Sequence, residues 1–141
     1  FYLTDAFQYM IDHGARIKVA EVGGWYDCGK LNTLLETNEI LLRQGASRRS
    51  DYPGTTINDP VYIEDGVEIR DSVIGPNVSI EQGSRVSGSR LEHVVLGEDS
   101  TVEDSELTNS MLGSRVLVRG FKGAITLGSE SEIVASNSGP R

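Results

Sequence analysis

Residues 71–118 read DSVIGPNVSIEQGSRVSGSRLEHVVLGEDSTVEDSELTNSMLGSRVLV, and they repeat with a period of five or six residues. An aliphatic residue recurs at this spacing here and just upstream, at Ile57, Ile63, Ile69, Ile74, Ile80, Val86, Leu91, Leu96, Val102, Leu107, Leu112 and Val118. The residue two positions earlier is always small or β-branched: Thr55, Val61, Val67, Ser72, Val78, Ser84, Ser89, Val94, Ser100, Ser105, Ser110 and Val116. This period matches neither an α-helix nor an ordinary alternating strand.

A repeat of this length indicates a solenoid. Each hexapeptide forms a short strand and a corner, and three of them make one coil that encloses the aliphatic residue and its small partner. The pattern breaks at 120–124 and resumes through Ile133, so we predict a left-handed parallel β-helix over residues 55–134, with about four to five coils. A β-sandwich is the alternative, but it would show two-residue alternation and hairpin turns.

Two residue types should shape the inside and the corners of the coils. The inner Ser and Thr hydroxyls are expected to bond the backbone at the narrow corners. Four glycines follow aliphatic positions where the chain must turn, and we expect them to supply left-handed backbone angles. These are Gly75, Gly97, Gly113 and Gly128.

Residues 1–45 show a different pattern, which is typical of an α/β unit. The apolar face of a first helix consists of Leu3, Ala6, Phe7, Met10 and Ile11. A second helical row, which ends before Gly45, consists of Leu31, Leu34, Leu35, Asn38, Leu41 and Leu42. Between them, Ile17 and Val19 alternate with Arg16 and Lys18, which predicts a short half-buried strand. Such a fragment cannot close a sheet, so we expect it to expose apolar surface unless it caps the end of the β-helix or pairs between chains.

The segments at 46–54 and 135–141 are predicted to lack regular structure. Residues 46–54 mix Ser, Gly and Pro with the pair Arg48-Arg49, which is typical of a linker with a basic spot that could meet phosphate or simply be solvated. Residues 135–141 are predicted to be a disordered tail. The expected organisation is therefore 1–45, a linker at 46–54, the β-helix at 55–134, and the tail.

The composition limits the classes of partner and compartment. Thirteen Lys and Arg against 21 Asp and Glu give a net charge of −8, which repels nucleic-acid phosphates. No apolar run could span a bilayer, and no signal-peptide pattern opens the chain. The single cysteine, Cys28, cannot form an internal disulfide and is interpreted as a small buried side chain. These features favour a cytoplasmic protein with no nucleic-acid or membrane partner.

Several runs carry a resemblance to a known family. These runs are LTDAFQYMIDHG (3–14), GWYDCGKLNTLLETNEILL (24–42), and DSVIGPNVSI, HVVLGEDSTV and NSMLGSRVLV within the repeat. They resemble the C-terminal part of sugar-1-phosphate nucleotidylyltransferases, most closely long-form glucose-1-phosphate thymidylyltransferases. The chain also begins at Phe1 without a Met, so we expect it to be a C-terminal piece of a longer protein.

The resemblance implies both a fold and an activity. It makes residues 1–45 the end of a truncated Rossmann-like catalytic domain and assigns the β-helix to assembly or regulation. The parent would join glucose 1-phosphate to dTTP or a related nucleoside triphosphate, with Mg²⁺, and release pyrophosphate. By resemblance the protein is a homo-oligomer, such as a trimer.

The resemblance also assigns one site residue. Trp25-Tyr26-Asp27-Cys28-Gly29 is similar to the family's W-x-D-x-G motif, whose aspartate helps to hold the catalytic Mg²⁺, so Asp27 takes that role by resemblance. Lys30 is a weaker candidate for a phosphate contact. From the residues alone, the favoured interpretation of Asp27 is a cap of the helix that begins near Lys30, because aspartates that cap helices far outnumber metal ligands. The family's Gly-rich nucleotide loop and second aspartate have no counterpart here, so the chain alone is expected to be inactive and to retain no Mg²⁺.

His93 supports an alternative function. Many β-helix proteins of this kind are acyltransferases that use a histidine as general base. His93 follows Leu91 by two positions and should point outward, where it could meet a neighbouring subunit. A general base also needs an acceptor and an acyl carrier within reach, and no second feature of the sequence supplies them. A purely structural β-helix is the remaining alternative.

Overall fold

The computed structural model describes residues 2–48 and 50–135. Two helices come first, α1 (Leu3–Asp12) and α2 (Leu31–Leu41), and α2 continues into a π-turn, η1 (Leu42–Ala46). Gly45, the residue at which the sequence predicts the helix to stop, breaks the helical backbone angles within η1, with a φ of 108°. None of the described helices is long and apolar enough to cross a bilayer.

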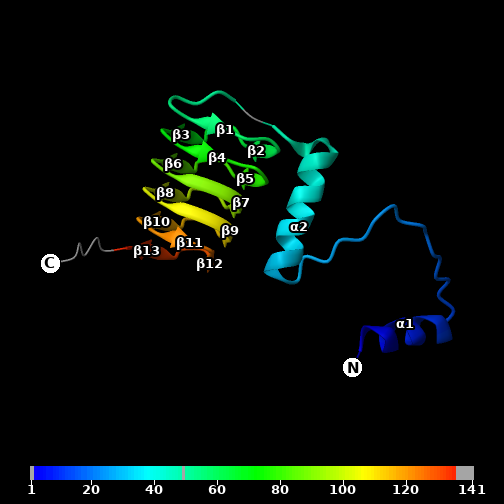
Figure 1. Cartoon of the computed structure of the whole chain (residues 1–141). Coiled ribbons are helices and arrows are strands. Elements are labelled where there is room, and N and C mark those ends of the chain that lie inside the picture. Colours follow the sequence, from blue (N-terminus) through cyan, green and yellow to red (C-terminus); the bar gives the residue numbers. More distant parts are fainter. Residues whose placement is uncertain (1, 49, 136–141) are drawn as a thin grey trace.

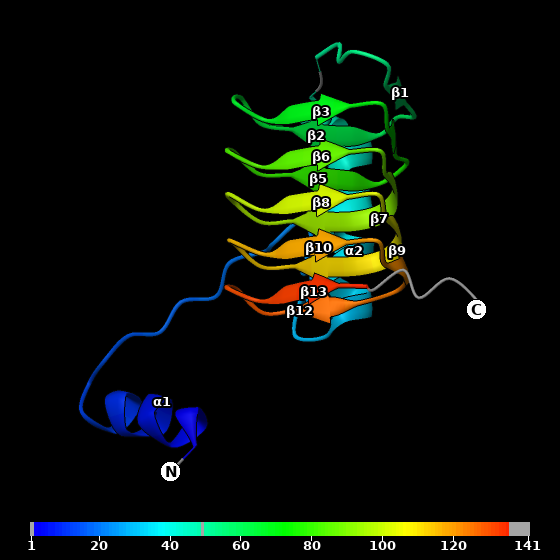
Figure 2. The same cartoon turned by 90° about the vertical axis from the view of Figure 1, so that its left-hand side faces the viewer.

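The rest of the described chain consists of short strands that stack in parallel (Figures 1 and 2). They are β1 (Thr56–Ile57), β2 (Val61–Ile63), β3 (Glu68–Arg70), β4 (Val73–Ile74), β5 (Val78–Ile80), β6 (Arg85–Ser87), β7 (Arg90–Leu96), β8 (Thr101–Glu103), β9 (Glu106–Leu112), β10 (Leu117–Arg119), β11 (Lys122–Gly123), β12 (Thr126–Leu127) and β13 (Glu132–Val134).

Each strand pairs with the strand one coil further along the chain. Val61 of β2 pairs with Val78 of β5, 17 positions later, and Leu117 of β10 pairs with Glu132 of β13, 15 positions later. The strands β3, β6, β8, β10 and β13 form one five-stranded face, which Figure 2 shows edge over edge. The long strands β7 and β9 each turn a corner and so join the other two faces into one sheet. The predicted parallel β-helix is confirmed.

The core is a column of aliphatic side chains inside the coils. Every aliphatic repeat position from Ile63 to Val118 is buried, and so is every small partner from Val61 to Val116. Because successive residues of a strand point to opposite faces, the residue between each pair points outward. The two inward positions of each unit therefore build the core.

Serines fit inside this dry core because their hydroxyls are satisfied by the backbone. The Ser89 hydroxyl donates to the Ser87 carbonyl at 2.7 Å and accepts the N–H of Ser105 at 3.1 Å. Ser105 repeats the pattern one coil later, where its hydroxyl accepts the N–H of Phe121. A buried hydroxyl with both roles filled avoids the cost of an unsatisfied polar group. The predicted bonding of the inner hydroxyls is confirmed.

The prediction for the corner glycines is correct at one position and wrong at three. Gly75 has a φ of 96°, but Gly97, Gly113 and Gly128 do not adopt positive φ. A Cβ on Gly97 would lie 2.7 Å from the backbone of Gly113 in the next coil. Gly113 meets Ser129 in the same way, at 2.6 Å, whereas no described residue lies within 4 Å of a Cβ on Gly128. At Gly97 and Gly113, glycine is therefore required by the close approach of successive coils and not by the backbone angle.

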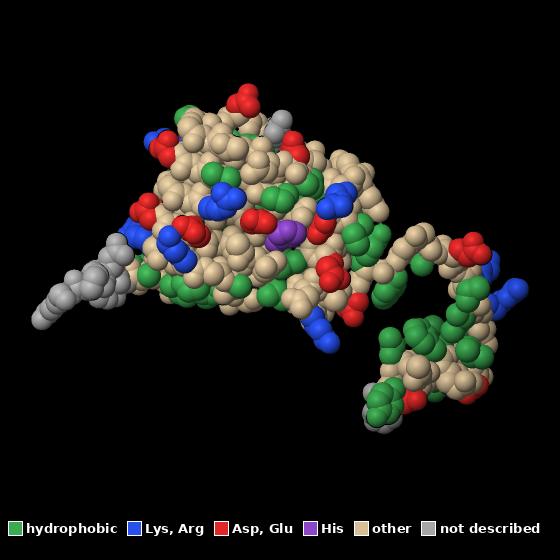
Figure 3. Space-filling view, in the orientation of Figure 1, with side chains coloured by type: hydrophobic (Ala, Val, Ile, Leu, Met, Phe, Trp, Pro, Cys, Tyr) green, Lys and Arg blue, Asp and Glu red, His purple; other side chains and the backbone are tan. Residues whose placement is uncertain are grey.

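The strand predicted around Ile17 and Val19 does not form. Neither residue belongs to a strand, and the exposed fraction of Val19 is 98%. A strand needs a neighbour to accept its backbone hydrogen bonds, and no described strand lies beside this segment. The expected exposure of apolar surface is confirmed, since α1 has no buried residue and hydrophobic side chains gather on its surface (Figure 3).

Helix α2 packs along the side of the β-helix and not on its end (Figure 1). It contacts β5, β7 and β9, and it buries Leu35, while Leu42 in the following π-turn is also buried. The expectation that residues 1–45 cap the end of the β-helix is therefore wrong for α2. The outward-facing residues of this face, including Val95 and Met111, are half-buried.

The segment after α2 follows the first coil. The N–H of Arg48 donates to the Val61 carbonyl at 2.9 Å, and the N–H of Ile63 donates to the Arg48 carbonyl at 2.8 Å. Tyr52 packs half-buried against the core. The basic spot is partly neutralised because Arg48 pairs with Asp65, and Arg49 lies outside the described residues. In the predicted tail, Ala135 bonds Arg119, and 136–141 lie outside the described residues.

Candidate functional site

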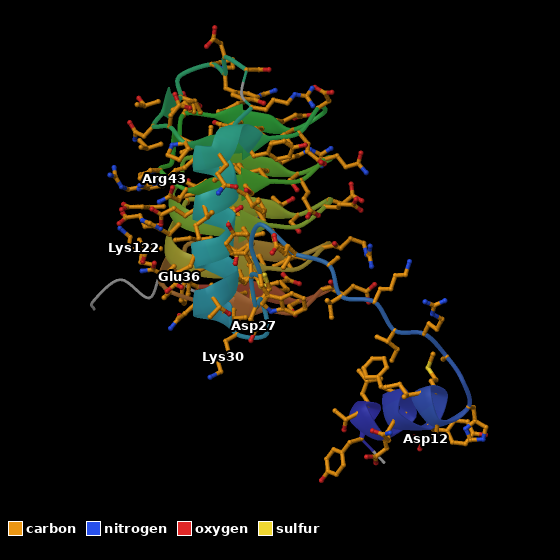
Figure 4. All side chains as sticks on the ribbon, turned by 90° about the vertical axis from the view of Figure 1, so that its right-hand side faces the viewer. Asp12, Asp27, Lys30, Glu36, Arg43 and Lys122 are labelled. Carbon is orange, nitrogen blue, oxygen red and sulfur yellow. The ribbon has the colours of Figure 1, made fainter. Side chains whose placement is uncertain are left out.

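Asp27 lies in an exposed turn just before α2. Its Oδ1 accepts the N–H of Gly29 at 2.9 Å, which closes a side-chain turn over two residues. The N-cap of α2 is Lys30, whose backbone carbonyl accepts the hydroxyl of Thr33 at 3.0 Å. Asp27 therefore does not cap the helix, contrary to the simpler reading of the sequence. Figure 4 shows Asp27 and Lys30 together at the end where α2 begins.

The environment of Asp27 fits one ligand of a metal site and not a whole site. Mg²⁺ is usually bound through one or two carboxylates together with phosphates and water. Gly29 orients the Asp27 carboxylate and leaves Oδ2 without a hydrogen bond within the described residues. In that same part of the chain, no three His, Cys, Asp or Glu side chains come close enough to hold a metal. Further ligands would have to come from outside residues 2–48 and 50–135.

The neighbours of Asp27 are equally open to solvent. Cys28 is exposed, so its interpretation as a buried side chain is wrong. Lys30 is exposed and extends from the start of α2 (Figure 4). An exposed turn that carries a carboxylate and an ammonium group can contact a phosphate and a cation, but it cannot exclude water by itself.

His93 lies at the corner where β7 passes from one face to the next. It has a φ of 53°, and Asn77 and Asn109 occupy the same corner in adjacent coils with φ of 60° and 46°. The side chain points outward, as the sequence predicts, but it points toward α2. Its Nδ1 lies 4.0 Å from Oε2 of Glu39 and 3.3 Å from the Asn77 amide nitrogen.

A shallow hollow of about 190 Å³ lies between α2 and this corner. It is lined by Asn32, Leu35, Glu36, Glu39, His93 and Asn109. Arg43 already pairs with Glu39 at 2.6 Å, one turn along the helix. Because Glu39 is paired, Glu36 supplies most of the negative charge on this wall, which disfavours substrates or carriers that bear phosphate groups.

The sequence did not reveal the polar contacts that hold α2 on the β-helix. Oδ1 of Asn38 accepts the hydroxyl of Ser79 at 2.6 Å, and its Nδ2 donates to the Asn77 carbonyl at 3.4 Å. The signal was present, because Asn38 is the one polar residue within the apolar row of the second helix. Its partners lie 39 and 41 positions away, so the pattern could not name them.

Comparisons with known proteins identify relatives of this chain by sequence. No family model matches the chain. Glucose-1-phosphate thymidylyltransferase of Streptomyces griseus is 37% identical over 120 residues, which cover 78% of this chain and 32% of that protein. The chain is a homologue of this nucleotidyltransferase.

Other relatives match a similar share of the chain. The glucose-1-phosphate thymidylyltransferase of Streptomyces antibioticus is 28% identical over 137 residues, which cover 82% of this chain and 38% of that protein. The bifunctional protein GlmU of Alkaliphilus metalliredigens is 26% identical over 117 residues, covering 79% and 25%. The chain thus spans about a third of the length of the curated thymidylyltransferases that it matches.

Proposed function

We propose that the chain is the C-terminal portion of a sugar-1-phosphate nucleotidylyltransferase. The parent joins glucose 1-phosphate to dTTP or a related nucleoside triphosphate and forms a nucleotide sugar and pyrophosphate. The observation that carries the proposal is the combination, in a homologue of glucose-1-phosphate thymidylyltransferases, of the Trp25–Gly29 segment before α2 with the β-helix after it.

The reaction defines what Asp27 would do. A phosphate oxygen of the sugar phosphate attacks the α-phosphorus of the triphosphate, and the bond to the leaving pyrophosphate breaks. Mg²⁺, when bound, offsets the negative charge of the phosphates. Asp27 would supply one carboxylate ligand, with its Oδ1 held by the N–H of Gly29. Lys30, at the start of α2, would add positive charge near a phosphate.

The β-helix is proposed to serve assembly. Its coils contact mainly their neighbours, so the stack can fold as a unit and present rigid outer faces to a second copy. A homo-oligomer such as a trimer, located in the cytoplasm, is the form that we propose for the parent. The chain by itself is proposed to be inactive, since a single carboxylate does not make a nucleotidyl-transfer site.

The decisive experiment measures pyrophosphate release by the full-length parent with glucose 1-phosphate, dTTP and Mg²⁺. Asp27→Asn keeps the shape of the side chain but removes its charge, and kcat should fall by about 100-fold or more. Asp12→Asn is the matched control, because Asp12 lies on α1 away from Asp27 (Figure 4) and should leave kcat unchanged.

Two results would count against the proposal. Unchanged turnover of the Asp27→Asn parent would remove Asp27 from the site. A parent that turns over no sugar phosphate with any nucleoside triphosphate would reject the activity itself. Acyl transfer gains no comparable support, because His93 faces Glu39 and an acidic hollow.

A further inference from the structure

Helix α2 is the link between the Asp27 turn and the β-helix. The described residues from Tyr2 to Lys30 are exposed throughout, whereas Leu35 and Leu42 are buried at 8% and 3% exposure. The position of Asp27 relative to the coils is therefore transmitted through α2 and the short turn before it. Whatever fixes α2 on the β-helix also fixes the carboxylate.

Apolar contacts alone would fix α2 weakly. Leucine side chains on a helix can slide or rotate over an apolar surface at modest cost, because dispersion and the hydrophobic effect are not directional. Hydrogen bonds have preferred distances and angles, so they select one rotation and one register. Within the described residues, Asn38 is the α2 side chain that hydrogen-bonds the β-helix, while Glu39 adds a longer contact of 4.0 Å to His93.

The partners of Asn38 are rigid parts of the fold. The hydroxyl of Ser79 comes from β5, which pairs with β2 and β7 on either side. The Asn77 carbonyl lies at the corner before β5, where the residue is 3% exposed and its backbone N–H donates to the Pro60 carbonyl. Asn38 thus binds two points of the coil stack that cannot move independently of it.

We propose that Asn38 is a positioning residue. By bonding Ser79 and Asn77, it fixes the rotation and register of α2 and so sets the place of the Asp27 carboxylate for the metal. The inference rests on the proposed function. Asn38 lies seven residues after Leu31, which is about 10 Å along a helix, so a small rotation at Asn38 carries over to the turn. A shift of about 1 Å at a catalytic group can cost about 100-fold in rate.

The docking step can be tested on the 141-residue chain by amide hydrogen exchange. Asn38→Ala and Ser79→Ala should each speed exchange of the amides from Leu35 to Leu41 by about fivefold, the effect of one ordinary hydrogen bond on a local opening equilibrium. The β-helix amides should keep their rates. Asn32→Ala is the control, because Asn32 is on the same helix but bonds nothing on the β-helix among the described residues. Unchanged exchange in both variants would overturn the docking role.

The positioning step is tested on the full-length parent. Asn38→Ala should raise the Mg²⁺ concentration for half-maximal rate and lower kcat, while the KM for the sugar phosphate stays constant. Combined with Asp27→Asn, Asn38→Ala should cause no further loss, because the group it positions is gone. A merely structural role would not produce this pattern.

The two proposals fail in different ways. If Asp27→Asn leaves turnover intact, the site assignment of the proposed function fails. If Asp27→Asn abolishes turnover but Asn38→Ala leaves the Mg²⁺ dependence unchanged, the assignment stands and the positioning role of Asn38 is overturned.

Discussion

Glycine occupies two different environments at the corners of this β-helix. Gly97 and Gly113 sit where the next coil approaches so closely that a Cβ would overlap its backbone, at 2.7 and 2.6 Å. Gly128 follows an aliphatic residue in the same way, yet a Cβ there would meet no atom of the described chain within 4 Å. The same residue type is therefore required at two positions and free at the third.

This difference predicts opposite effects for one substitution. Gly97→Ala should lower the free energy of unfolding by about 1–3 kcal/mol, because the added methyl group forces two coils apart. Gly128→Ala should change it by less than about 1 kcal/mol and in the stabilising direction, because alanine restricts the unfolded chain. Urea unfolding followed by circular dichroism measures both. Equal effects at the two positions would contradict the close-approach explanation.

The sequence pattern predicted the features that follow from the spacing of the repeat. It missed the features that depend on contacts between residues far apart in the sequence. The buried aliphatic positions follow from the repeat, because inward and outward residues alternate along each strand. The reason for Gly97 did not follow, since it depends on the gap between coils. The partners of Asn38 were equally out of reach, because the helix pattern contains no information on residues 39 or more positions away. The role of Asp27 as a metal ligand was predicted only from the resemblance to a known family.

At the scale of elements, the segment before β1 covers the first coil. Tyr52 packs half-buried against the core, and Arg48 pairs in parallel with Tyr62. Burial raises the pKa of the Tyr52 phenol, and Asp65 adds to the increase, while a hydrogen bond to Ser50 and the charge of Arg48 oppose it. The neutral phenol is therefore the form that the folded state favours.

The raised pKa of Tyr52 predicts a loss of stability in alkali. Because the folded pKa is above the unfolded value, the contribution is complete below about pH 10 and disappears as the pH rises through the folded pKa. Tyr52→Phe has no phenol to ionise, so its urea midpoint should fall less between pH 9 and 11 than that of the unmodified chain. Tyr26→Phe, at an exposed turn, should behave like the unmodified chain. Parallel curves for all three proteins would contradict the prediction.

The strand predicted around Ile17 and Val19 shows that an alternating pattern alone does not determine whether a strand forms. Alternation of apolar and charged residues indicates a segment suited to one buried face, but a strand forms only when a neighbour pairs with its backbone. In the described chain the coils pair with one another and leave this segment aside. Helix α2, in contrast, packs against the described β-helix, because its apolar row contacts the outer face of β5, β7 and β9.

At the scale of the whole molecule, residues 2–30 and the β-helix with α2 should respond independently to unfolding. The first part is exposed throughout the described structure, and α1 buries no residue. The second part holds the core, and stability in a stack of coils comes from each coil and its neighbours. Residues 2–30 should therefore contribute almost nothing to the stability of the coils.

A chain of residues 30–141 tests this independence. Its free energy of unfolding in urea should lie within about 0.5 kcal/mol of that of the full chain, because no buried contact is removed. Sedimentation velocity should show less self-association than for the full chain, because the exposed side chains of Phe7, Met10 and Trp25 are gone. A loss above about 1 kcal/mol would mean that residues before Lys30 support the coils. The apolar surface of α1 would then be part of the fold, and the position of Asp27 would depend on the segment before it as well as on α2.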